Sequence, residues 1–151
     1  MDELWIHEKV EIAAPAAAVW RVLTEPALTK KYMFGCEALS DWKPGSALLW
    51  EGEYEGKKMV FVSGKVLQFE PPRLLRYTIF DPNGKLPDLP EHHLEMRCTL
   101  TERGGVTLLE LSQGDFNSVA DGKQRYEHSL QNSSADLMGK MKALAEGLAR
   151  G

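Results

Sequence analysis

The amino-acid sequence predicts an α+β fold in which a curved antiparallel β-sheet of about six to seven strands wraps around a long C-terminal α-helix. Three observations predict it. Short runs rich in Val, Ile, Leu, Phe, Tyr and Thr alternate with turn residues from residue 35 to 116. Two short helical patterns follow the first strand, and one apolar stripe at helical spacing occupies the tail. A chain of 151 residues has the size of one domain, assigned to residues 1–151.

The first elements are a strand and two short helices. Residues 3–13 carry apolar side chains among charged ones and indicate a strand. Pro15 suits the first turn of a helix, and the good helix formers of residues 16–23 continue it. Pro26 ends that helix and begins a second short one that extends to Lys31 or Met33.

The middle of the chain predicts the sheet. Turn signals such as Pro44-Gly45 and Gly104-Gly105 separate the β-rich runs. Because the connections are short, neighbouring strands must be mostly antiparallel. Five strands are expected near residues 46–54, 57–70, 73–80, 92–103 and 106–116, with a sixth, shorter one near 35–39.

The tail predicts one long helix from about Val119 to Leu148. Its apolar residues recur at spacings of three, four and seven and form one stripe: Tyr126, Leu130, Leu137, Met141, Leu144 and Leu148. A helix of this length cannot be buried on all sides in a small domain. We therefore expect it to lie across one face of the sheet.

Composition excludes several classes of partner. Eighteen basic residues against 22 acidic ones give a net charge of −4, which argues against nucleic acid and anionic membranes. No apolar run is long enough to span a bilayer, and the N-terminus lacks the pattern of a signal peptide. Cys36 and Cys98 form neither a disulfide framework nor a zinc site. We expect a cytoplasmic protein without a metal or cofactor.

Four segments carry a resemblance to a known family: APAAAVWRVLTEPALTKKYM at residues 14–33, WKPGSALLWEG at 42–52, SGKVLQFEPPRLLRYTI at 63–79 and GGVTLLELSQGDF at 104–116. With these, the chain resembles the START-like (SRPBCC) superfamily and, within it, the Hsp90-ATPase-activator-homologue group, over nearly its whole length. The resemblance implies the helix-grip fold. That group often has a Gly-Trp pair in the long helix, where this sequence has Ser133-Ser134.

The concave face of the sheet is the candidate site. Strand alternation directs aromatic and sulfur-containing side chains toward the long helix, while residues 132–135 of that helix are small or polar. Either side chains from the sheet fill this space, or it remains a cavity with apolar walls. The candidate ligand-binding residues are Trp50, Tyr54, Phe61, Tyr77, His92, Met96, Tyr126, Ser133, Ser134 and Leu137.

Three functions follow from these observations. The first is a binding module for a small hydrophobic or aromatic molecule. The resemblance adds a chaperone-interaction domain of the Hsp90-activator kind, and an enzyme like the polyketide cyclases and dehydratases, which would need acid–base groups in the cavity. His92 could bind a ligand oxygen or transfer a proton, or it could be a partly buried histidine bonded to a backbone carbonyl. No nucleophile is paired with it, so no catalytic residue is assigned.

Overall fold

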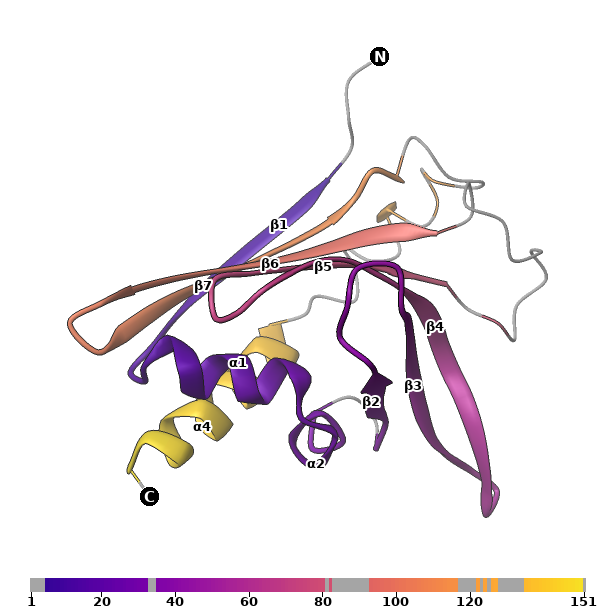
Figure 1. Cartoon of the computed structure of the whole chain (residues 1–151), viewed down its shortest axis with the longest axis horizontal. Helices are drawn as coiled ribbons and strands as arrows, with labels where there is room; N and C mark the ends of the chain where they lie inside the picture. The colour runs from indigo at the N-terminus through magenta and orange to yellow at the C-terminus, as the bar shows by residue number, and fades with distance from the viewer. Residues whose placement is uncertain are drawn as a thin grey trace.

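Seven antiparallel strands form one curved sheet in the order β1-β7-β6-β5-β4-β3-β2 in the computed structural model of the chain (Figure 1). The structure describes residues 5–32, 35–80, 82, 93–116, 122, 124, 126, 127 and 135–150. The strands are β1 (Ile6–Ile12), β2 (Glu37–Ser40), β3 (Ala47–Tyr54), β4 (Lys57–Glu70), β5 (Leu74–Ile79), β6 (Leu94–Arg103) and β7 (Val106–Gly114). The helices are α1 (Ala16–Thr24), α2 (Pro26–Thr29) and α4 (Ala135–Arg150).

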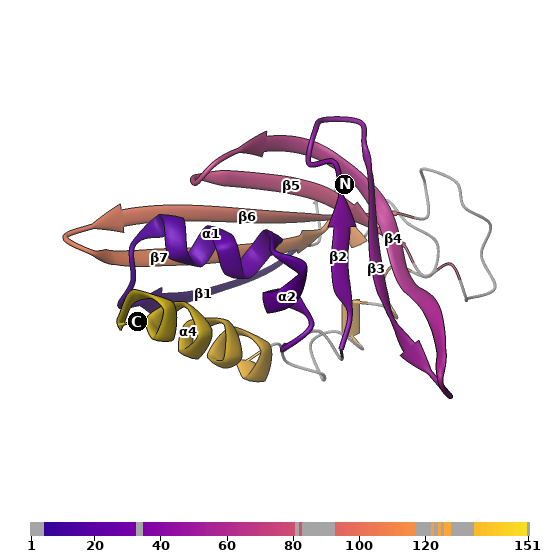
Figure 2. The same ribbon diagram turned by 60° about the horizontal axis from the view of Figure 1, so that its bottom comes forward.

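The three helices lie on the same side of the sheet (Figure 2). Helix α4 packs against α1 and the adjacent edge strand β1. Two hydrogen bonds connect α4 to the end of β1: the Lys142 ammonium donates to the Glu11 carbonyl at 2.9 Å, and the Ala13 amide donates to Glu146 Oε2 at 2.8 Å. The predicted helix-grip arrangement is therefore confirmed. None of the described helices is long and apolar enough to cross a membrane.

The predicted strands and the first two predicted helices agree with the observed ones to within a few residues. Gly104 and Gly105 both have positive φ, +58° and +81°, which is the backbone that a tight β6–β7 turn requires. Pro15 differs slightly from the expectation, because its backbone is extended and it precedes α1 instead of opening it. The tail is helical at residues 122, 124, 126 and 127 and throughout α4.

Strand β4 gives the sheet its curvature. Its pairing shifts by one residue twice, so that Phe61 has no partner in β3 and Leu67 has none in β5. Such bulges bend a strand and increase its twist. The β3–β4 hairpin consequently leans away from the rest of the sheet, and β2 lies along its outer edge (Figure 1).

The core lies between the concave face of the sheet and the helices. Its fully buried side chains come from every layer and include Ile12, Val22, Leu48, Val66 and Leu109. A second, smaller cluster surrounds Leu94 and Phe116 at the end of β7. Alternation in the strands accounts for this pattern, since every second residue faces the helices.

Candidate functional site

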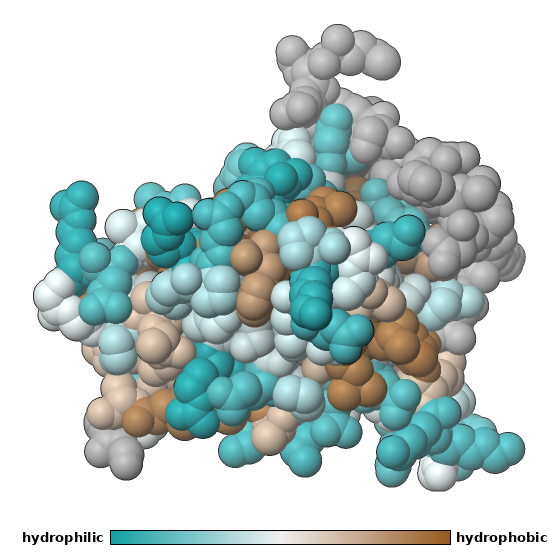
Figure 3. Space-filling model, viewed as in Figure 1, coloured by the Kyte–Doolittle hydropathy of each residue, from teal (hydrophilic) through white to brown (hydrophobic). Residues whose placement is uncertain are grey.

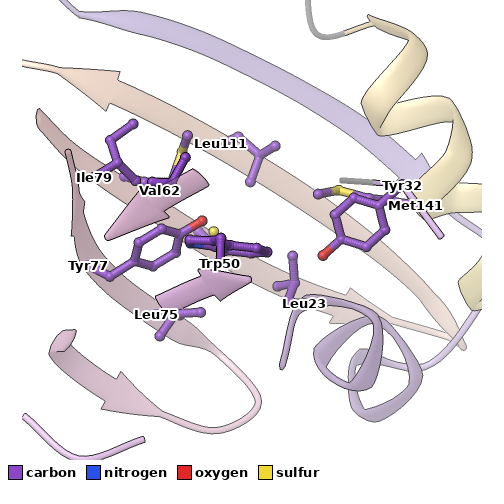
Figure 4. A pocket seen from close by; sticks show the side chains of 11 residues that line it. Leu23, Tyr32, Trp50, Val62, Leu75, Tyr77, Ile79, Leu111 and Met141 are labelled. Atoms are coloured by element: carbon purple, nitrogen blue, oxygen red, sulfur yellow. The ribbon is translucent and has the colours of Figure 1, made fainter. Parts of the chain in front are cut away.

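A cavity of about 120 Å³ lies inside the large core, between the sheet and the helices (Figure 4). Strand β5 contributes Leu75, Tyr77 and Ile79, three alternate residues that point toward the helices. Met96 pairs with Tyr77 across β5 and β6, and Cys98 pairs with Leu75. These five side chains form the floor of the cavity because residues paired across an antiparallel sheet face the same side.

The side walls come from the neighbouring strands. Trp50 of β3 and Val62 of β4 are paired and close one side, and Leu111 of β7 closes the other. The rings of Trp50 and Tyr77 have centroids 6.2 Å apart and are inclined by 45°. In Figure 4 the Tyr77 hydroxyl points into the space beside the Trp50 indole.

The helical side of the cavity consists of Leu23 at the end of α1, Tyr32 just after α2, and Met141 of α4. The Tyr32 hydroxyl donates a hydrogen bond to the Val22 carbonyl at 2.8 Å. This bond fixes the position of the tyrosine ring over the cavity and ties the segment after α2 back to α1.

The cavity wall is apolar and uncharged. Of the lining residues that the structure describes, Tyr32, Tyr77, Trp50 and Cys98 carry a group that can form strong or weak hydrogen bonds, and none carries a charge. Burial raises the pKa of Tyr32 and of Tyr77 well above the usual tyrosine range, and the nearby Cys98 raises both further. Both phenols therefore stay protonated at physiological pH, and the site remains neutral.

Three of the sequence-predicted site residues line the cavity: Trp50, Tyr77 and Met96. The structure places Tyr54, Phe61 and Tyr126 elsewhere. His92, Ser133 and Ser134 lie outside the described residues. Leu137 belongs to the first turn of α4, and its side chain is outside the described part of the chain.

Two of the corrections concern the β3–β4 hairpin. Tyr54 has the alternation of Trp50, but it lies at the hairpin tip, beyond the helices, and is 59% exposed. Phe61 is the unpaired residue of the first β4 bulge, and its ring packs over Gly52 beside Cys36. The bulge turns Val62, instead of Phe61, toward the cavity. The alternation of residues along a strand indicates neither where the helices that cover the sheet end nor where a bulge lies.

The third correction concerns Tyr126. It is helical, as expected, but it packs edge-to-face against Phe116 with ring centroids 5.5 Å apart. It joins the smaller cluster with Leu94, at the end of β7. The residue therefore covers a separate part of the core.

Sequence reasoning did not select several lining residues, among them Leu23, Tyr32, Val62, Leu111 and Met141. The signals for Leu23 and Met141 were present, since both lie on the apolar stripes of their helices. Tyr32 and Val62 carried no such signal. The position of Tyr32 depends on how the predicted short helix packs against α1, and that of Val62 depends on a bulge that alternation does not reveal.

The described residues include no group of three His, Cys, Asp or Glu side chains that could hold a metal ion. His93, the neighbour of His92, has its Nδ1 2.9 Å from the Thr78 hydroxyl and its ring stacked on Phe80. Glu95 of β6 forms ion pairs with Arg76 and Arg97, which lower the pKa of its carboxyl. These polar groups are not among the residues that line the cavity.

Cys98 is expected to be unreactive in the folded protein. Burial raises the pKa of its thiol to about 12, and the pKa of the buried Cys36 thiol is raised as well. The thiolate is the reactive form. A solution at pH 8 is about four units below the pKa of the Cys98 thiol, so almost none of it is ionised in the folded protein. Labelling with an aromatic disulfide reagent at pH 8 should therefore be slow in buffer and rapid in denaturing urea. The variant Cys36→Ser isolates Cys98, and rapid labelling of this folded variant would contradict the buried position.

The chain was compared with known proteins. The family model for "Activator of Hsp90 ATPase homolog 1-like protein" matches residues 13–146. A solution structure of a Cytophaga hutchinsonii protein is 36% identical, covers 98% of this chain and 99% of its own, and has a TM-score of 0.74. No curated protein is significantly similar in this comparison.

Two further solved structures share the fold. A crystal structure of a Nitrosomonas europaea protein has a TM-score of 0.75 at 23% identity over the full length of both chains. A Plasmodium falciparum protein described as an HSP90 activator has a TM-score of 0.57 at 15% identity and covers 74% of this chain and 73% of its own.

Proposed function

The chain belongs to the family of activator of Hsp90 ATPase homolog 1-like proteins, and we propose that it is a binding module for one small hydrophobic or aromatic molecule. The observation that carries this proposal is the cavity of about 120 Å³ between the sheet and the helices. Ligand sites in proteins are typically apolar spaces with a few polar groups, and this cavity has that composition.

The size of the cavity supports a ligand of about one ring. Protein interiors are normally packed without voids of this size. At about 24 cal/mol per Å³, an empty space of 120 Å³ costs about 3 kcal/mol of folding free energy. An apolar cavity of about 150 Å³ holds a benzene molecule. A ligand of this size would restore the missing contacts and recover part of the cost.

The polarity of the cavity also favours an organic ligand over water. A buried water is held by about three hydrogen bonds. Two of the groups that could supply them contribute little. The Tyr32 hydroxyl already donates to the Val22 carbonyl, and the Cys98 thiol is a weak donor. Among the described lining residues, the Tyr77 hydroxyl and the Trp50 indole N–H remain as strong donors for a water, fewer than the usual three hydrogen bonds, so an organic molecule displaces water from this space at little cost.

The enzyme alternative receives less support from the lining groups. General acid–base catalysis works best with a pKa near the operating pH, whereas burial moves the pKa of Tyr77 and of Cys98 away from it. A noncovalent role fits side chains that keep their protons.

The chaperone alternative is favoured by the family description and by the fold shared with the HSP90 activator. It requires an exposed docking surface. Brown, apolar groups on the face in Figure 3 are separate and lie among hydrophilic side chains. The large apolar side chains exposed in the described part of the chain come from four different strands: Leu39, Tyr54, Leu67 and Val106. The cavity is the stronger basis for a function.

Toluene binding and its loss on filling the cavity test the proposal. Wild-type protein titrated with toluene should show saturable NMR shifts at the methyl groups of Met96, Leu111 and Met141. In Val62→Phe the added ring should enter the cavity, weaken toluene binding at least tenfold and lower the free energy of unfolding by less than about 1 kcal/mol. Native mass spectrometry of gently purified protein would detect a ligand retained from the cell.

A matched substitution controls for general disruption. Val66 lies on the same strand, is fully buried and is not among the lining residues. Val66→Phe overpacks a filled region and should lower the free energy of unfolding by about 1–3 kcal/mol. Equal destabilisation by the two substitutions would mean that the cavity is already filled. Absence of toluene binding would favour the chaperone alternative, to be measured as a change in the ATPase rate of Hsp90.

A further inference from the structure

The two tyrosines of the cavity differ in how their hydroxyls are satisfied. The Tyr32 hydroxyl donates to the Val22 carbonyl at 2.8 Å. The Tyr77 hydroxyl has no hydrogen-bond partner among the residues that the structure describes, although it lies in the same cavity wall. Tyr77 is on β5, the central strand of the sheet, and is a partly buried residue packed against the main core.

Trp50, which contacts the Tyr77 ring, also has a hydrogen-bond donor without a partner among the described residues. The tryptophan is only 4% exposed, and its indole N–H likewise has no partner within the described ranges. A buried donor without an acceptor is energetically costly, so buried polar groups are nearly always satisfied by protein, water or ligand. The buried Trp50 donor and the partly buried Tyr77 hydroxyl lie on one cavity wall and indicate the place where a polar atom of the ligand belongs (Figure 4).

We propose that the Tyr77 hydroxyl, with the Trp50 indole N–H as a second donor, selects a neutral ligand of one-ring size that carries one oxygen acceptor, such as a phenol or a small ketone. This inference rests on the proposed function and specifies its ligand. The lining residues within the described ranges carry no charge, which disfavours carboxylates and amines because neither would find a counter-ion among them. The raised pKa of Tyr77 supports the assignment, since the hydroxyl keeps its proton and acts as a donor.

Phenol and toluene form a matched pair of probes, because they have nearly the same shape and phenol carries a hydroxyl where toluene carries a methyl group. In Tyr77→Phe, phenol affinity should fall about tenfold, the effect of one hydrogen bond, while toluene affinity stays the same or improves. The control is Tyr32→Phe. It removes a hydroxyl from the same cavity that is already bonded to the protein, so the phenol-to-toluene affinity ratio should stay within twofold of wild type.

Urea unfolding without ligand gives a second readout. Removing an unpartnered hydroxyl should leave the stability of Tyr77→Phe equal to or above that of wild type, whereas Tyr32→Phe leaves the Val22 carbonyl unpaired and should be less stable. A phenol-to-toluene ratio unchanged in Tyr77→Phe would overturn the inference and leave the apolar binding site intact. Failure of both probes to bind wild-type protein would overturn the proposed function and, with it, this inference.

Discussion

Gly64→Ala is expected to lower the free energy of unfolding by about 3 kcal/mol or more. Gly64 lies in β4, where the strand passes close to β5. A methyl group at this position would overlap the carbonyl oxygen of Thr78 and approach its Oγ1 to 2.9 Å. The obstacle is backbone, so it cannot move aside without separating the two strands.

The damage should extend to the cavity. Val62 precedes Gly64 on β4, and Tyr77 and Ile79 flank Thr78 on β5, so separation of these strands displaces residues of the cavity wall. Urea unfolding followed by the fluorescence of the buried tryptophans measures the stability. Toluene titration of any folded fraction measures the cavity.

The matched control is the same substitution in a helix. Gly139 lies in α4, and nothing is within 4 Å of the position that its methyl group would take. Gly139→Ala should therefore raise the free energy of unfolding by about 0.5–1 kcal/mol, because alanine has the higher helix propensity. A Gly64→Ala variant within about 1 kcal/mol of wild type would show that β4 and β5 are not so closely apposed.

Thr29→Val is expected to lower the free energy of unfolding by about 2–3 kcal/mol. Thr29 is fully buried, and its hydroxyl oxygen accepts a hydrogen bond from the Ala38 amide at 2.9 Å. The hydroxyl proton is within reach of the carbonyl oxygens of Cys36 at 3.1 Å and Pro26 at 3.2 Å. Valine has the same shape but leaves the buried amide and a carbonyl of the α2–β2 connection unsatisfied.

Two variants distinguish the hydrogen bonds from packing. Thr29→Ser keeps the hydroxyl and should recover most of the stability lost in Thr29→Val. Thr107 is equally buried, but its hydroxyl only donates, to the Ala14 carbonyl at 2.7 Å, so Thr107→Val should cost about 1 kcal/mol. Faster hydrogen exchange of the Ala38 amide in Thr29→Val would locate the damage. Equal losses in Thr29→Val and Thr107→Val would refute the bridging role of Thr29.

The sequence predicted the elements well because they depend on local signals. The Gly104-Gly105 turn, the proline before α1 and the stripe of the tail each act within a few residues. The family resemblance read from residues 14–33 and three later segments is confirmed by the family model over residues 13–146. Alternation also directed aromatic and sulfur-containing side chains toward the helices, and of the candidates Trp50, Tyr77 and Met96 line the cavity.

The site was predicted less completely, because facing the helices is necessary but not sufficient for lining a cavity. Tyr54 alternates in phase with Trp50 but lies past the end of the covering helices. The bulge at Phe61 shifts the alternation of β4, so that Val62 lines the cavity in place of Phe61. Tyr126 has the right helical spacing and packs against a different cluster. These positions depend on where elements end relative to one another, which is a non-local property of the chain.

By itself, then, the sequence determined the order of strands and helices, the apolar character of the concave face and the family. The order of elements and the apolar face follow from periodicities of two and 3.6 residues and from turn chemistry, which need no knowledge of distant contacts. The family follows from the resemblance of residues 14–33 and of three later segments. Only the tertiary structure decided that a space of about 120 Å³ remains inside. It also decided that, within the described part of the chain, the Tyr32 hydroxyl has a hydrogen-bond partner and the Tyr77 hydroxyl has none. Whether a side chain fills a space or a hydroxyl finds a carbonyl depends on residues far away in sequence, because packing and hydrogen bonding act through space.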